Sequence, residues 1–136
     1  MRPADTRYEV VDAQVHVSQD AVQRGDIEPV VQPSANGAVR AGVSVGEPVT
    51  FEARVEVPPH GGEVIAVEWD YEGRGDYPVT APIGASKALV RLSATHAFSR
   101  PGTYFSVVRA TSQRQGDART PYGRVQNIAR VRVVVR

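Results

Sequence analysis

The chain has 136 residues, of which 41% are hydrophobic and 23% charged, which is typical of one globular domain. Its formal net charge of +1 argues against a protein that binds nucleic acid by neutralising many phosphates. The absence of cysteine excludes a disulfide scaffold and a cysteine nucleophile, and no apolar stretch reaches the roughly 18 residues that a membrane span needs.

Residues 1–25 are predicted to be an N-terminal extension or linker, and residues 26–136 the main domain. The extension contains one alternating stretch, residues 8–17, which is a candidate for an additional strand. Its first ten residues lack the apolar region of a signal peptide. If the protein is exported, its signal is therefore expected upstream of this chain.

Short stretches of alternating apolar and polar residues, separated by turns rich in proline and glycine, follow the extension. The clearest runs from Val49 to Val57, and the next buries Ile65, Val67, Trp69 and Tyr71 on one face. No stretch has the apolar periodicity of a helix. The predicted strands are residues 27–31, 39–45, 49–57, 65–71, 88–95, 103–111 and 129–135, with a long hydrophilic connection over 112–127. This pattern predicts an all-β sandwich with a mostly valine core.

Three motifs then occur in order: Val45-Gly-Glu-Pro-Val-Thr-Phe51, Glu68-Trp-Asp-Tyr71, and His96-Ala-Phe-Ser-Arg-Pro-Gly-Thr-Tyr104. Together with the closing strand they resemble the PKD (polycystic kidney disease) domain family over about residues 38–135. The resemblance implies an immunoglobulin-like sandwich of two antiparallel sheets and about seven strands, extracellular or at the cell surface, without catalytic activity. The residues expected in its structural core are Phe51, Trp69, Tyr71, His96 and Tyr104.

The sequence departs from the family pattern in two places. The turn after Tyr71, residues 72–76, is longer than the family's glycine–aspartate turn. In the strand that begins near Thr103, the outward positions are Phe105, Val107 and Arg109, where the family usually has threonines. We therefore expect a partly apolar outer face on this strand, which is a candidate contact surface.

Asp70, Glu72 and Asp76 surround the rebuilt turn and form a weak candidate calcium site, because calcium prefers clustered oxygen ligands. Three acids fall short of a complete set of six to eight ligands, and Arg74 between them opposes a cation. A solvated turn is the simpler interpretation, and no cofactor is expected.

The sequence contains motifs that resemble catalytic sites, but the residues around them do not support catalysis. Gly42-Val-Ser-Val-Gly46 matches the nucleophile elbow of hydrolases, but that elbow joins a strand to a helix, whereas Ser44 leads into another strand. The three histidines, His16, His60 and His96, are too far apart in sequence to suggest a metal pair. The chain is therefore not expected to be an enzyme.

Two functions stay open. The first is a noncatalytic accessory, spacer or protein-docking module of a larger exported protein of bacterial type, with Phe105, Val107, Arg109 and Tyr122 as its interaction surface. Its partner would be an adjacent domain of the same chain or a second copy, and neither nucleic acid nor a membrane is expected. The alternative occupant of the Phe105 and Val107 face is the N-terminal stretch over residues 8–17. The alternative is a carbohydrate-binding module that uses the 112–127 loop and Tyr122 to bind polysaccharide.

Overall fold

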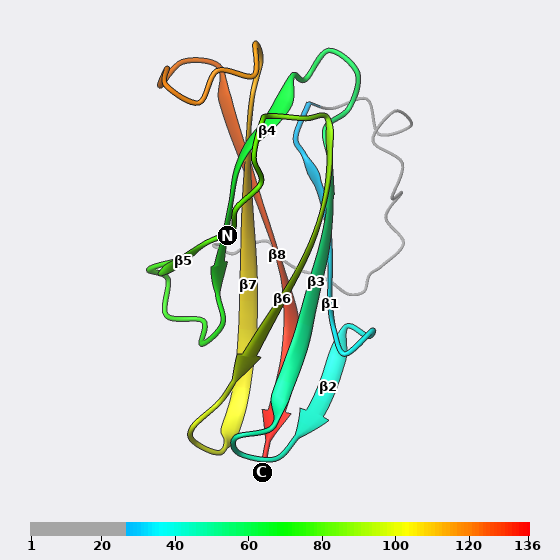
Figure 1. Ribbon diagram of the computed structural model, residues 1–136, viewed down its shortest axis with the longest axis vertical. Helices are drawn as coiled ribbons and strands as arrows, with labels where there is room; N and C mark the ends of the chain where they lie inside the picture. Colours follow the sequence, from blue (N-terminus) through cyan, green and yellow to red (C-terminus); the bar gives the residue numbers. More distant parts are fainter. Residues whose placement is uncertain (1–26) are drawn as a thin grey trace, which may run out of the picture.

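The computed structural model describes residues 27–136, which form eight strands and no helix. The strands make two sheets that lie face to face (Figure 1). The smaller sheet has the order β1 (Val30–Ala35), β3 (Pro48–Glu56), β6 (Leu89–Ala97). The larger has the order β2 (Arg40–Val43), β8 (Arg124–Val135), β7 (Gly102–Gln113), β4 (Glu63–Asp70), β5 (Val79–Thr80). The predicted all-β, immunoglobulin-like sandwich is confirmed.

The core lies between the sheets and is built mainly from valine and aromatic side chains. In β3, Val49, Phe51, Ala53 and Val55 are buried while the residues between them face away, as the alternation predicts. Valine suits these positions because its branched side chain packs well on a pleated surface. The other buried valines of the core are Val43, Val57, Val64, Val67, Val90, Val108, Val131, Val133 and Val135.

The chain changes sheets between β1 and β2. Asn36 and Gly37 both have positive φ, 50° and 82°, which turns the chain sharply after β1. The Asn36 backbone N–H donates to the Thr50 carbonyl at 2.8 Å, and its Oδ1 accepts from the Thr50 N–H at 2.9 Å. Beyond this turn β2 pairs in parallel with the end of β8, so the chain's first two strands contribute to different sheets.

Two details of the predicted strands were wrong. In β4 the pairing with β7 shifts between Val64 and Ala66, so Val64 and not Ile65 is fully buried before Val67 resumes the alternation. The predicted 112–127 connection is also too long, because the ladder between β7 and β8 continues to the pair Gln113 and Arg124. The hairpin loop therefore spans only residues 114–123.

The remaining differences are shifts of strand ends, such as β1 at Val30–Ala35 where residues 27–31 were predicted. The two-residue β5 was not predicted, since it is too short to show alternation. The N-terminal extension, including residues 8–17, lies outside the described residues.

Candidate functional site

The outer face of the larger sheet combines exposed apolar residues with arginines. Residues directly opposite each other in an antiparallel pair share a face, and β7–β8 pairing places Phe105 opposite Arg132, Val107 opposite Arg130, and Arg109 opposite Ile128. Phe105 is 49% exposed and Ile128 48% exposed. We call this surface the basic-apolar face and define it by Arg40, Phe105, Val107, Arg109, Ile128, Arg130, Arg132 and Val134.

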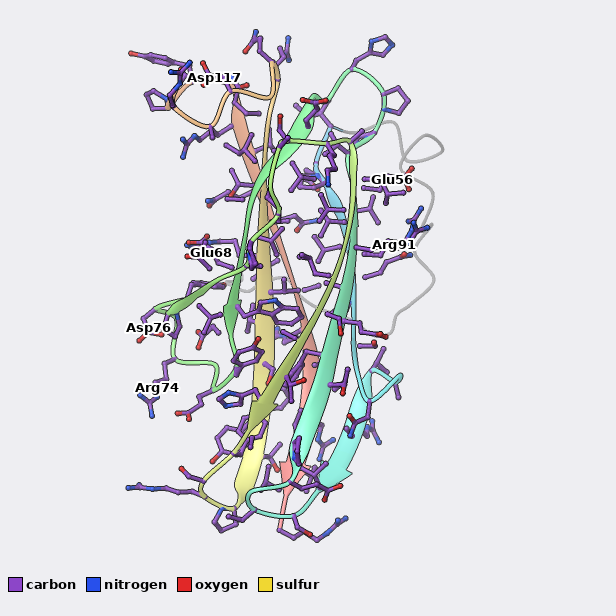
Figure 2. All side chains as sticks on the ribbon, in the orientation of Figure 1. Glu56, Glu68, Arg74, Asp76, Arg91 and Asp117 are labelled. Atoms are coloured by element: carbon purple, nitrogen blue, oxygen red, sulfur yellow. The ribbon has the colours of Figure 1, made fainter. Side chains whose placement is uncertain are left out.

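The outer face of the smaller sheet has a different character. It carries acids and bases side by side, among them Glu52, Arg54, Glu56 and Arg91. Arg54 lies 3.1 Å from the Glu56 carboxylate. Figure 2 shows Glu56 and Arg91 on this side of the molecule and Glu68 on the opposite side. Mixed charges of this kind are typical of a solvated surface, so the two outer faces are chemically unequal.

Arg109 is held within the basic-apolar face by residues of this chain. Its Nε and Nη2 atoms each lie 2.9 Å from Oε1 of Glu68 on β4. Its guanidinium also lies 4.0 Å from the ring centre of Tyr77, a cation–π contact. Burial raises the pKa of the Tyr77 hydroxyl, and the nearby Arg109 charge opposes this shift. Arg109 therefore fixes the segment after β4 to the sheet, and it is half-buried rather than exposed.

Two acids of the candidate calcium site, Asp70 and Glu72, hold the turn itself. Asp70 is only 1% exposed, and its two carboxylate oxygens accept the backbone N–H groups of Arg74 and Gly75. Glu72 forms an ion pair with Arg74. Figure 2 shows Arg74 and Asp76 at the outer side of this loop. Within residues 27–136 no three acids or histidines gather as a metal site.

The hairpin loop between β7 and β8 is organised around the buried side chain of Gln113. Its Oε1 accepts the backbone N–H groups of Gln115 and Asp117 at 2.7 and 2.8 Å, and its Nε2 donates to the Tyr122 carbonyl at 3.0 Å. These bonds explain why the ladder extends beyond the apolar part of the sequence. The Tyr122 ring is 79% exposed.

The structure does not bring Tyr122 next to Phe105. The loop follows the far end of β7, and at about 3.3 Å per residue the strand from Phe105 to Gln113 spans about 26 Å. Tyr122 is therefore separated from Phe105, Val107 and Arg109, with which the sequence groups it, because a sequence pattern does not give distance along a hairpin. Ile128 and Arg132, which do lie beside these residues, were not part of that predicted surface.

A column of aromatic rings crosses the interior. Tyr71 stacks on Trp69 with ring centres 5.5 Å apart and on His96 with ring centres 4.4 Å apart. Phe98 and Tyr104 continue the column, with a 4.4 Å separation. The Tyr104 hydroxyl donates to the Arg100 carbonyl at 2.8 Å, which fixes the turn before β7. These contacts join the two sheets, because Tyr71 directly follows β4 and His96 lies in β6.

His96 takes part in this column through its ring rather than through a hydrogen bond at Nε2. The sequence predicts a satisfied structural hydrogen bond for His96, but at Nε2 this prediction is wrong, because among residues 27–136 the atom is buried without a hydrogen-bond partner. Burial lowers the pKa of His96, and the negative charge of Glu72 opposes this shift only in part. The folded protein therefore takes up this proton less readily than the unfolded chain.

Because the pKa of His96 is lower in the folded protein than in the unfolded chain, we expect the protein to be less stable in acid. As the pH falls below the ordinary histidine pKa of 6.5, the unfolded chain binds a proton at His96 that the folded protein resists, so the free energy of unfolding decreases. Urea unfolding above and below this pH measures the effect. His96→Gln should flatten the dependence, whereas the exposed-site control His60→Gln should preserve it. If the free energy of unfolding of His96→Gln kept the same pH dependence, other titratable groups would be its cause.

Ser44 lies in an exposed turn between β2 and β3, and its N–H donates to the Glu47 carboxylate at 2.9 Å. A strand and not a helix follows it, so the geometry of a nucleophile elbow is absent there. A polar hollow of about 460 Å³ opens elsewhere, beside the turns after β4 and β6. Its lining residues are Glu72, Arg74, Ser99, Arg100 and Tyr104.

The three sequence motifs lie at the start of β3, at the end of β4, and in the β6–β7 connection. A family model of the PKD domain matches residues 32–120, more than half of the chain. The chain belongs to the PKD domain family. No curated protein matches its sequence. The predicted family is thus confirmed, although the match ends within the β7–β8 loop and does not include β8.

PKD domains are typically noncatalytic extracellular modules for protein–protein interaction. In this PKD domain the described residues contain no helix long and apolar enough to cross a bilayer. The aromatic column and the turn held by Asp70 give the motif residues structural roles. The basic-apolar face does not include these motif residues. It is therefore the candidate surface for a function specific to this chain.

Proposed function

We propose that this PKD domain is a noncatalytic docking module of an exported protein and that it binds another protein surface through the basic-apolar face. The observation that carries the proposal is the exposure of Phe105 and Ile128 among arginines, on one outer face only. Aromatic residues and arginine are enriched where proteins bind each other. Glu68 already holds Arg109, whereas Arg40 and Arg132 are exposed and present positive charge to a partner. A partner with acidic and apolar side chains fits this chemistry.

Photo-crosslinking in the full protein, with its neighbouring segments, tests this proposal. A photoreactive phenylalanine at position 105 should give several-fold more crosslinks to another protein surface than the same group at Thr95, which is exposed on the smaller sheet. Arg132→Glu should reduce the yield from position 105 because it reverses one charge of the face. Equal yields from positions 105 and 95 would contradict the proposal.

Carbohydrate binding is the second candidate, favoured by the 79% exposure of Tyr122 on a loop ordered by Gln113. An exposed ring on a fixed loop can stack against a sugar. Retention of the protein on insoluble polysaccharide that Tyr122→Ala abolishes, and Phe105→Ser preserves, would favour this function over docking.

A further inference from the structure

The basic-apolar face has a chemical complement in the sequence of the same chain. Residues 8–23 contain three carboxylates, Glu9, Asp12 and Asp20, and neither lysine nor arginine. The face presents Arg40 and Arg132, which are both exposed and lie opposite each other on β2 and β8. Opposite charges favour an encounter between these two surfaces, while a second copy of the face would set arginines against arginines.

The apolar residues of this segment also suit the face. Val11, Ala13, Val15 and Val17 alternate with polar residues, so an extended chain would place all four on one side. That side would cover exposed apolar surface such as Phe105 and Ile128, which is the main favourable contribution when apolar groups associate.

The described chain starts close to β8, the strand that carries Ile128 of the basic-apolar face. Asn127 Nδ2 donates to the Pro29 carbonyl at 2.9 Å, which fixes the chain beside β8. Ile128, on the basic-apolar face, is the next residue after Asn127. Residues 18–26 can span up to about 30 Å when extended, which is enough to pass around the edge of β8.

The edge of β8 leaves room for this path. In the described part of the chain, β2 pairs only with residues 132–135 of β8, and the first half of the strand has no neighbouring strand on that side. A chain leaving Pro29 therefore meets no strand of the larger sheet between itself and Ile128.

We infer that residues 8–23 bind the basic-apolar face within the same molecule, with their carboxylates toward its arginines and their valines toward Phe105 and Ile128. The inference rests on the proposed docking function, because it makes this segment a built-in occupant of the docking surface. An external partner would then have to displace it and would need the same acidic and apolar chemistry.

The lack of cysteine allows a direct test in the full chain. A nitroxide spin label on Gln14→Cys should remove most of the NMR signal intensity of the Phe105, Val107 and Ile128 amides. The Ser93 and Thr95 amides, on the outer face of the smaller sheet, should keep theirs. Asp12→Arg should restore the lost intensity, whereas the control Asp5→Arg, outside the segment, should not.

Equal broadening of both faces, or none, would overturn the inference. So would broadening that disappears on dilution, because it would then arise between molecules. These results are independent of the crosslinking from position 105. Crosslinks to another domain without broadening by the Gln14 label would support the docking function and contradict binding of residues 8–23 to the face. The absence of both crosslinks and broadening would contradict both proposals.

Discussion

Trp69→Ala is expected to lower the free energy of unfolding by about 3–5 kcal/mol, the usual cost of removing a large aromatic side chain from a core. Trp69 is 1% exposed, stacks on Tyr71 and lies 5.6 Å from the ring centre of Phe51 in the other sheet. Its loss leaves a cavity where the two sheets meet. Urea unfolding followed by circular dichroism measures the change without depending on the tryptophan signal.

Two variants test the cause of this loss. Trp69→Phe keeps an aromatic ring at the position and also removes the indole N–H, which has no hydrogen-bond partner among the described residues. It should therefore cost clearly less than Trp69→Ala. Tyr122→Ala removes a ring that is 79% exposed and should change stability little. A loss below about 1 kcal/mol for Trp69→Ala would contradict its central position in the core.

Gly62→Ala is expected to cost roughly 2–5 kcal/mol, because it combines backbone strain with a steric clash. Gly62 has a φ of +96°, and a Cβ at this position would lie 2.1 Å from the Gln113 carbonyl oxygen. The backbone at Gln113 is fixed by the end of the β7–β8 ladder and cannot easily withdraw. Thermal and urea unfolding of the variant measure the loss.

Gly46→Ala is the matched control for the clash. Gly46 has a similar φ of +81°, but a Cβ there would have no atom within 4 Å. Its substitution should cost only about 1–2 kcal/mol, the conformational penalty of a left-handed residue. Equal losses at the two glycines would show that Gln113 yields and that strain alone decides the effect.

Much of the sandwich can be predicted from alternation because one face of most strands is core. The strand from Val49 to Val57 shows this clearly. Alternation fails where a bulge shifts the pattern, as at Ile65, and where a buried side chain is polar, as at Gln113. The first half of β8 has few large apolar residues, so only its pairing with β7 identifies residues 124–128 as strand.

Only part of the candidate site can be predicted from the sequence, because alternation within one strand does not show which residues of other strands lie beside it. Phe105 and Val107 follow from their outward positions in one strand, but Ile128 joins them only through the register of β8. The engagement of Arg109 with Glu68 links residues 41 positions apart in the sequence, which no local pattern reveals. Local alternation thus identifies faces, and long-range pairing decides which residues share one.

The described chain starts and ends at opposite ends of the sandwich's long axis (Figure 1). β1 and β8, the first and last strands, both run along this axis, and their hydrogen bonds to β3 and β7 lie across it. A pull between residue 27 and residue 136 would therefore shear these ladders, so that many hydrogen bonds resist together instead of opening one at a time. The topology that exposes the basic-apolar face along the side of the molecule thus also suits the domain to transmit tension.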